Sequence, residues 1–180
     1  MEELELIKRC RQADRLAQEL LYSRYADRLY RITLRYVKIQ LEAEDVLIIA
    51  LNKVFSSLES FSYQEKGSLE AWMKRIVINE SLMWLRKKHN FNLTETIDEN
   101  TPEPNLKAVA ETQGEDILRA ISELPTGYRT VFNLNVIEGY EHGEIAGMLG
   151  ISANTSRSQL FKAKAMLQKM LSKEGVYYGT

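Results

Sequence analysis

The 180-residue chain is poor in the side chains that bind metals or form disulfides. It contains one cysteine, Cys10, and two histidines, His89 and His142, which stand far apart in the sequence. One cysteine cannot form an internal disulfide, so the thiol tells little about the redox environment. Metal sites need several such ligands at short, characteristic spacings. We therefore predict neither a metal site nor a cofactor.

Long hydrophobic runs and enzyme motifs are also missing from the sequence. No apolar stretch approaches the roughly 20 residues that a membrane-spanning helix needs, and the acidic start is unlike a secretory signal. We expect a cytoplasmic protein without membrane insertion. There is no glycine-rich phosphate loop and no nucleophile beside a base. Glu44 and Asp45 are adjacent acids, but neighbours on a helix point about 100° apart, so they do not form a catalytic pair. The chain is therefore not expected to be an enzyme.

The formal net charge is only -1, but the charges are segregated along the chain. One basic segment contains a single acid, Glu80, among Lys74, Arg75, Arg86, Lys87 and Lys88. A second basic segment contains no acid and comprises Arg157, Lys162, Lys164, Lys169 and Lys173. Acids gather between the two, at Glu95, Asp98, Glu99, Glu103 and Glu111. This distribution is typical of DNA binding, although a solvated helix face explains either basic segment taken alone.

Apolar residues recur at three- and four-residue steps, as on the buried face of amphipathic helices. The N-terminal stripes are Ala17, Leu20, Leu21, Tyr25, Leu29, Ile32 and Tyr36; Ala43, Val46, Leu47, Ala50, Val54 and Leu58; and Leu69, Trp72, Met73, Ile76 and Met83. Asp14 and Ser68 are predicted to cap the first and third of these helices. Trp72 is expected in the core, whereas Trp84 lies off its stripe and is expected at the surface.

The periodicity fails from about residue 89 to residue 112, where two prolines and several acids indicate a linker. It resumes with Ile117, Leu118, Ile121 and Leu124, and then with Tyr128, Val131, Phe132 and Val136. We therefore predict an all-α protein with two small helical domains, residues 1–90 and 113–180. A flexible acidic linker over residues 91–112 is expected to join them.

The second domain is predicted to contain a helix-turn-helix. Ile145, Ala146 and Leu149 lie on one face of the first helix, and Gly150 can adopt the left-handed conformation that ends a helix. Ser152 is predicted to cap the second helix. That helix turns one side inward, with Ser156, Leu160, Ala163, Leu167 and Met170. Its outer side is expected to carry Asn154, Thr155, Ser158, Gln159 and Lys162.

In such a motif the second helix enters the major groove and its first turns meet base edges. Asn and Gln side chains can pair with adenine, and Ser or Thr with several bases. We expect Arg157, Lys162 and Lys164 to contact phosphates mainly, which gives affinity without sequence choice. A helical hairpin with a solvated outer face is the alternative. We favour DNA binding because turn chemistry, cap, apolar stripe and basic content agree.

These segments resemble a known family over nearly the full chain. SELPTGYRTVF (122–132) and EIAGMLGISANTSRSQL (144–160) resemble the C-terminal domain of bacterial RNA polymerase sigma factors. LYSRY (21–25), AEDVL (43–47), AWMKRIVINE (71–80) and RKK (86–88) resemble the N-terminal domain. Two helical domains on one linker are similar to the small extracytoplasmic-function (ECF) class.

The resemblance implies a protein that binds core RNA polymerase and directs it to promoters. The helix-turn-helix would read the minus-thirty-five element through Asn154, Thr155, Arg157, Ser158, Gln159 and Lys162. The N-terminal domain would read the minus-ten element and hold the melted strand through Arg75, Asn79, Arg86, Lys87 and Lys88. The loop Ser62–Gly67 is a candidate pocket for an extruded base. Core polymerase would be contacted by Glu44, Asp45, Ile48, Ile49 and Lys53, and an anti-sigma protein is a further expected partner.

The sequence departs from the family at two places. After AEDVL the family continues with Gln and an acid, where this chain has Ile48 and Ile49. At least one of the two would be exposed beside the expected docking surface. The polymerase contact could be retained in apolar form, weakened, or replaced by another partner; we favour a retained but altered contact. Near position 83 the family's usual acid is replaced by Met83, which makes the outer face of that helix more apolar.

The main alternative function is a DNA-binding regulator that acts without core polymerase. A helix-turn-helix on an effector or oligomerisation domain serves such regulators, and the isoleucines at 48 and 49 are the feature in its favour. Co-purification with core polymerase separates the two functions.

Overall fold

The structure is a computed structural model that describes residues 1–88 and 114–173. These residues form helices and turns without a strand, which confirms the all-α prediction. The chain divides into two compact units, Met1–Asn90 and Phe91–Thr180. The predicted acidic linker falls in residues 89–113, outside the described residues. Within the described ranges no helix is long and apolar enough to cross a membrane.

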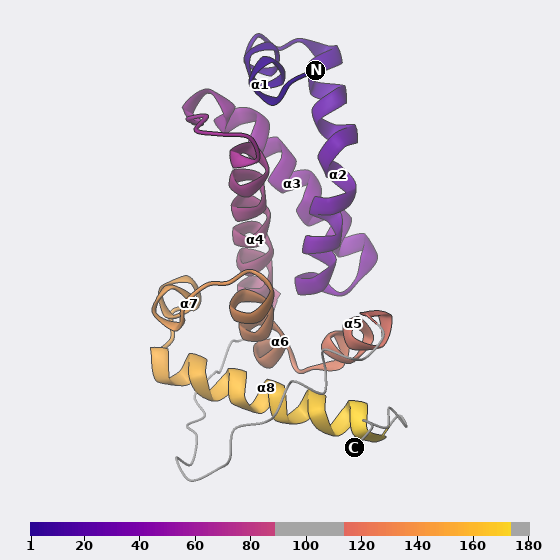
Figure 1. Cartoon of the computed structure of the whole chain (residues 1–180), viewed down its shortest axis with the longest axis vertical. Helices are drawn as coiled ribbons and strands as arrows, with labels where there is room; N and C mark the ends of the chain where they lie inside the picture. Colours follow the sequence, from indigo (N-terminus) through magenta and orange to yellow (C-terminus); the bar gives the residue numbers. More distant parts are fainter. Residues whose placement is uncertain (89–113, 174–180) are drawn as a thin grey trace. The chain divides into compact units, whose positions relative to one another are not determined.

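The first unit is built from four α-helices and one short 3₁₀ turn (Figure 1). In chain order these are α1 (Glu3–Arg11), α2 (Arg15–Val37), α3 (Gln40–Ser57), η1 (Leu58–Ser60) and α4 (Ser68–Lys88). Helices α2, α3 and α4 pack on one another, while α1 packs on α2 and η1. The unit is therefore a three-helix core with a short N-terminal helix across one end.

The core of the first unit is formed mainly by residues of the predicted apolar stripes. Leu21, Leu29, Val54, Leu69 and Met73 are each at most 1% exposed. Burial of a whole leucine or methionine side chain contributes about 1.5–3 kcal/mol, so the three long helices are held mainly by their inward faces. The predicted cap of α2 is confirmed, since the Asp14 carboxylate accepts the N–H groups of Leu16 and Ala17 at 3.0 and 3.2 Å.

The prediction that Ser68 caps α4 was wrong. Ser68 is the first residue of α4, and its hydroxyl accepts the N–H of Gln64 instead. The amides at this helix start donate to a carboxylate from another helix, Glu3 of α1. Local sequence spacing gives no signal for this cap, because its two parts are more than 60 residues apart.

Two further predictions for α4 need correction. Met83 was placed on the inward stripe but is 43% exposed, because the helix buries the face of Val77, Ser81 and Leu85. Trp84 was expected at the surface, yet it is half-buried against an apolar cluster formed by Val37, Ala43 and Val46. Met83 therefore contributes to the outer face, as the comparison with the family pattern suggested.

The second unit contains α5 (Gly114–Glu123), α6 (Thr126–Phe132), the π-helical segment η3 (Asn133–Ile137), α7 (His142–Leu149) and α8 (Ala153–Lys173). Helices α5, α6 and α7 all pack on α8, the longest helix of this unit. In Figure 1, α7 lies beside the beginning of α8 and α5 beside its later part. Val131, Leu134, Ile145 and Leu167 are fully buried between them.

Two residues predicted for the core of this unit are exposed. Leu118 on α5 is 54% exposed, and Val136 is 46% exposed. Val136 lies in the π-helical segment, where the N–H of Glu138 bonds to the carbonyl of Asn133, five residues earlier. That wider turn breaks the 3.6-residue period on which the stripe was counted, so the inward face passes to Asn133 and Leu134.

Candidate nucleic-acid interface

The turn between α7 and α8 is fixed by its own backbone. Gly150 has φ 69° and ψ 35°, the left-handed conformation that glycine adopts without a Cβ clash. The N–H of Ile151 then donates to the carbonyl of Ala146 at 3.1 Å, a bond typical of this helix ending. Ser152 follows as the predicted cap, and its hydroxyl accepts the N–H of Thr155 at 2.9 Å. The two helices thus meet at a defined turn of three residues.

A hydrogen bond that sequence reasoning missed also joins the two helices. Nδ1 of His142, at the start of α7, lies 2.8 Å from the hydroxyl of Ser156 on α8. Burial lowers the pKa of His142, and the positive charges of Arg157 and Lys164 lower it further. A neutral imidazole is therefore favoured here. The signal in the sequence was a polar residue, Ser156, on an otherwise apolar stripe.

The exposed face at the start of α8 carries part of the predicted DNA-reading set. Asn154 and Arg157 are exposed, and Nη1 of Arg157 donates to Oδ1 of Asn154 at 2.7 Å. Thr155 and Lys162 are half-buried. Asn154 and Arg157 thus form one polar pair on the first two turns, the part of a recognition helix that meets base edges.

The predicted outer positions of Ser158 and Gln159 were wrong, since these residues are 3% and 2% exposed. Gln159 lies one turn before the fully buried Ala163, so it belongs to the flank of the inward stripe. Helical spacing alone does not determine how wide the buried face of a helix is, and on α8 this face includes both Ser158 and Gln159. Oε1 of Gln159 is buried and has no hydrogen-bond partner among the described residues.

The predicted minus-ten residues on α4 are all exposed: Arg75, Asn79, Arg86, Lys87 and Lys88. Lys88 also pairs with the Glu42 carboxylate of α3 and lies 4.8 Å from the centre of the Trp84 ring. Its charge is therefore partly neutralised within the unit.

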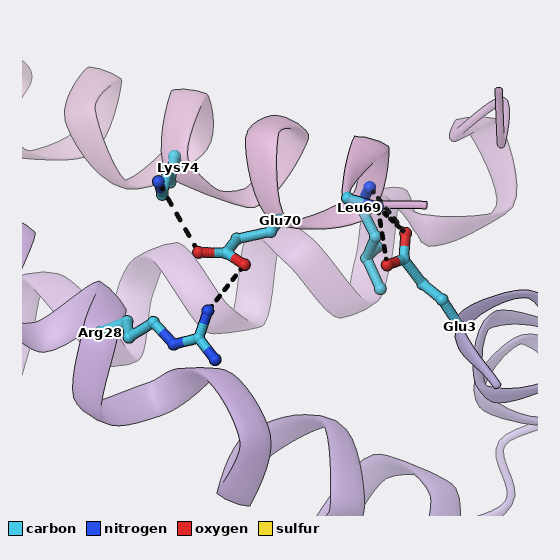
Figure 2. Close-up of polar contacts among 6 residues, drawn as sticks. Glu3, Arg28, Leu69, Glu70 and Lys74 are labelled. Carbon is cyan, nitrogen blue, oxygen red and sulfur yellow. Dashed lines mark hydrogen bonds and ion pairs between the residues drawn. The ribbon is translucent and has the colours of Figure 1, made fainter. Parts of the chain in front are cut away.

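An ion-pair cluster lowers the positive charge near the start of α4. Figure 2 shows Glu70 between two cations. Its carboxylate lies 2.9 Å from Nη1 of Arg28 on α2 and 3.6 Å from Nζ of Lys74. The basic surface of α4 therefore lies mainly in its later turns.

A cavity of about 440 Å³ opens beside the loop that was predicted to receive an extruded base. Its lining combines loop residues, among them Ser62, Gln64 and the acid Glu65, with Trp72 and Arg75 of α4. The Trp72 ring packs on Phe61, with ring centres 4.9 Å apart. Trp72 was expected in the core but is only half-buried: it lines this cavity as well as packing on Phe61. An aromatic wall, polar groups and a cation are together the chemistry that holds an unstacked base.

A groove of about 380 Å³ runs between α2 and α3 where core polymerase was expected to bind. Glu44, Leu47 and Ile48 of α3 line one side, and Tyr22 and Tyr30 of α2 line the other.

Ile48, which lines this groove, and its neighbour Ile49 are the two residues that depart from the family pattern. Both are exposed, Ile48 by 57% and Ile49 by 54%. Asp45 is exposed too. Lys53 bonds to Glu80 at 2.7 Å.

Two family models match the chain, one on each compact unit. The model described as sigma-70 region 2 matches residues 21–91, and the model described as sigma-70 region 4 matches residues 114–167. The first match contains most of α2 and all of α3 and α4, with the groove and the cavity. The second contains α7, the turn and most of α8.

Curated relatives match over most of this chain at low identity. An ECF RNA polymerase sigma factor, SigE of Mycolicibacterium smegmatis, is 29% identical over 160 residues, which is 85% of this chain and 61% of that protein. The RNA polymerase sigma factor SigV of Bacillus subtilis is 29% identical over 146 residues, covering 81% of this chain and 85% of that protein.

Two solved structures share the fold at 20% identity. CnrH, solved in complex with the cytosolic domain of CnrY, has a TM-score of 0.52 and covers 94% of this chain and 97% of its own. The sigma factor RpoE of Bartonella quintana, solved with the anti-sigma factor NepR, has a TM-score of 0.53. The match covers 86% of this chain and 96% of the RpoE chain.

Proposed function

The chain belongs to the ECF type of RNA polymerase sigma factors, and we propose that its two units divide promoter recognition between them. It directs core RNA polymerase in transcription initiation. The observation that carries this function is the order of the two family matches, region 2 on the first unit and region 4 on the second. A DNA-binding regulator that acts without polymerase needs a helix-turn-helix, but it does not need a unit that matches region 2.

The second unit reads the minus-thirty-five element as duplex DNA in this proposal. Asn154 supplies base contacts from the first turn of α8, with Thr155 beside it, while Arg157 and Lys162 contact phosphates. Exposure of Asn154 and Arg157 supports these roles. Gln159 and Ser158 are withdrawn from the reading set because both are buried.

The first unit reads the minus-ten element and holds the melted strand. One base leaves the stack and enters the cavity beside Trp72, where Arg75 contributes a positive charge. Arg86, Lys87 and Asn79 lie further along α4 and contact the strand's backbone or bases. Lys88 takes a smaller part than Arg75 and Lys87, since it already faces Glu42 and Trp84.

Core polymerase binds at the groove between α2 and α3. Glu44 and Asp45 provide carboxylates there, and Ile48 and Ile49 provide an exposed apolar surface. Exposed apolar groups beside a groove are typical of protein interfaces. Lys53 acts through its bond to Glu80, which fixes α3 against α4, more than through a direct contact.

An anti-sigma protein is a further proposed partner. Structures of this fold have been solved with the cytosolic domain of CnrY and with the anti-sigma factor NepR. An initiation factor with these partners works in the cytoplasm, where core polymerase and promoter DNA are found, and we assign it no enzymatic step.

Co-purification tests the function. The tagged chain is mixed with purified core polymerase, and the bound complex is challenged with a library of promoter fragments. We expect a stable complex that enriches one promoter class. A chain that leaves core polymerase unbound, yet retains duplex DNA by itself, is the regulator that acts without polymerase.

A further inference from the structure

Helix α1 is bonded to both ends of the loop that lines the cavity. At the beginning of the loop, Arg11 donates through Nε to the carbonyl of Leu58 at 3.2 Å and through Nη2 to the carbonyl of Phe61. At its end, the Glu3 carboxylate accepts the N–H groups of Gly67 at 3.0 Å and of Leu69 at 3.2 Å. Figure 2 shows the Glu3 side chain reaching the first turn of α4.

Glu3 and Arg11 are the first and the last residue of α1. The two ends of the helix therefore hold the two ends of the loop. The helix itself is firmly seated. Leu6 and Ile7 are fully buried and Cys10 is 5% exposed. A helix held by three buried side chains gives the loop two fixed points.

The loop has few internal contacts that would fix its shape. Ser62 and residues 64–67 are exposed. Two bonds close the turn into α4, from the N–H of Gln64 to the Ser68 hydroxyl at 3.4 Å and from the N–H of Ser68 to the carbonyl of Glu65 at 3.0 Å. Ordering exposed backbone costs about 1–2 kcal/mol per residue, so external anchors decide how well the loop is ordered.

The bonds from α1 act on residues that shape the cavity. The carbonyl that Arg11 holds belongs to Phe61, whose ring packs on Trp72. The amide that Glu3 holds belongs to Gly67, whose φ of +93° sets the direction in which the chain enters α4. The two bonds thus fix the loop on either side of the opening.

We propose that Glu3 and Arg11 are positioning residues for base selection: they hold the loop in the one shape that accepts the preferred extruded base. Neither residue lines the cavity, and both act through the loop backbone. The inference rests on the proposed role of the cavity in reading an unstacked minus-ten base. A binding site held in shape before its ligand arrives loses less conformational entropy on binding, and this gain in affinity goes to the base that fits the held shape.

Hydrogen exchange of the free chain tests the anchor without DNA or polymerase. In Glu3→Ala the amide of Leu69 should exchange about fivefold faster, the factor that loss of a typical helix cap produces. Glu5→Ala removes an exposed carboxylate from the same helix and should leave that rate unchanged. Glu3→Gln keeps one acceptor and provides a milder variant if the alanine change unfolds α1. Unaltered exchange in both Glu3 variants overturns the proposal.

Base preference provides the second readout. Core polymerase carrying each variant transcribes a promoter library with a randomised minus-ten element. We expect Glu3→Ala and Arg11→Ala to flatten the preference at one minus-ten position by about fivefold, with the minus-thirty-five preference intact. Lys8→Ala is the matched control for Arg11.

The results distinguish positioning by α1 from the proposed promoter recognition. If the wild-type chain selects minus-ten bases and both variants select them equally sharply, positioning by α1 is wrong while the proposed function stands. If the wild-type chain with core selects no promoter, the proposed function fails and this inference fails with it. A uniform loss over every position and over both promoter elements also overturns it, because that is the result of a general fold defect.

Discussion

The Nζ atom of Lys53 lies 2.7 Å from Oε1 of Glu80, so a cation on α3 is committed to a carboxylate on α4 that is only 8% exposed. A buried carboxylate that loses its partner bears the cost of desolvation alone. Lys53→Met should therefore lower the free energy of unfolding by about 1–3 kcal/mol, toward the lower end because Lys53 is 53% exposed.

Urea denaturation of the variant and the wild type measures this change. Lys8→Met removes an exposed lysine from the same unit and should leave the midpoint where it is. If Lys53→Met is as stable as the wild type, the pair contributes nothing and Lys53 is again available as a polymerase contact.

His142 is expected to make the second unit sensitive to acid. Its pKa is lowered in the folded chain by burial and by Arg157 and Lys164, so the unfolded chain binds the proton more tightly. Stability is then complete above about pH 6.5, the unfolded pKa, and is lost as the pH falls from there toward the lower folded pKa. Thermal unfolding of the wild type across this window, compared with His142→Asn, measures the effect. Parallel curves for the two proteins would show that His142 does not couple to folding.

The exposed isoleucines should matter for polymerase binding and little for folding. Ile48→Gln combined with Ile49→Glu restores the residue types usual in the family. Because both side chains are more than half exposed, stability should change by no more than about 0.5 kcal/mol. If the contact is retained in apolar form, affinity for core polymerase should fall about tenfold.

A titration of labelled core polymerase measures that affinity. Leu16→Gln changes another exposed apolar residue, 69% exposed on α2, and serves as the control. A double variant that binds core more tightly than the wild type shows that the isoleucines weakened the contact, and one that binds equally tightly shows that they do not contribute to it.

Three changes on α8 separate base reading from phosphate contact and from packing. Asn154→Ala should change which minus-thirty-five sequences are bound, whereas Lys162→Ala should weaken binding to all of them and reduce its salt dependence. Gln159→Met fills a similar volume and removes a buried oxygen that lacks a partner. It should keep or raise stability and leave promoter choice unchanged. Promoter choice that shifts with Gln159→Met would return Gln159 to the reading set.

Much of the fold was predictable because helices with one buried face repeat their apolar residues regularly. The stripes through Leu29 and Val54 predicted α2 and α3 with nearly correct ends, and Asp14 marked a start that depends on the next three residues alone. Predictions failed where the helical period changed, and where a residue at the edge of an apolar stripe was assigned to the exposed face. The π-helical turn at Asn133–Ile137 moved Val136 outward, and Gln159 at the flank of its stripe turned out buried.

The site could be predicted only where it depends on one segment of sequence. The turn at Gly150 and the cap at Ser152 are local, and both are present. The bonds from Glu3 to the start of α4 and from Lys53 to Glu80 join distant segments, and a single sequence carries no signal for them. The same holds for the pair of Lys88 with Glu42, which engages a cation that was predicted to bind DNA.

The central claim is that this chain gives core RNA polymerase its choice of promoter. Transcription from a reconstituted enzyme tests it most directly: core polymerase, with and without the chain, is given a promoter recovered from the enrichment library and the same DNA with a scrambled minus-ten element. The account predicts a transcript from one start site only when the chain and the intact promoter are both present. Equal transcription with and without the chain, or from the intact and scrambled DNA, would contradict it.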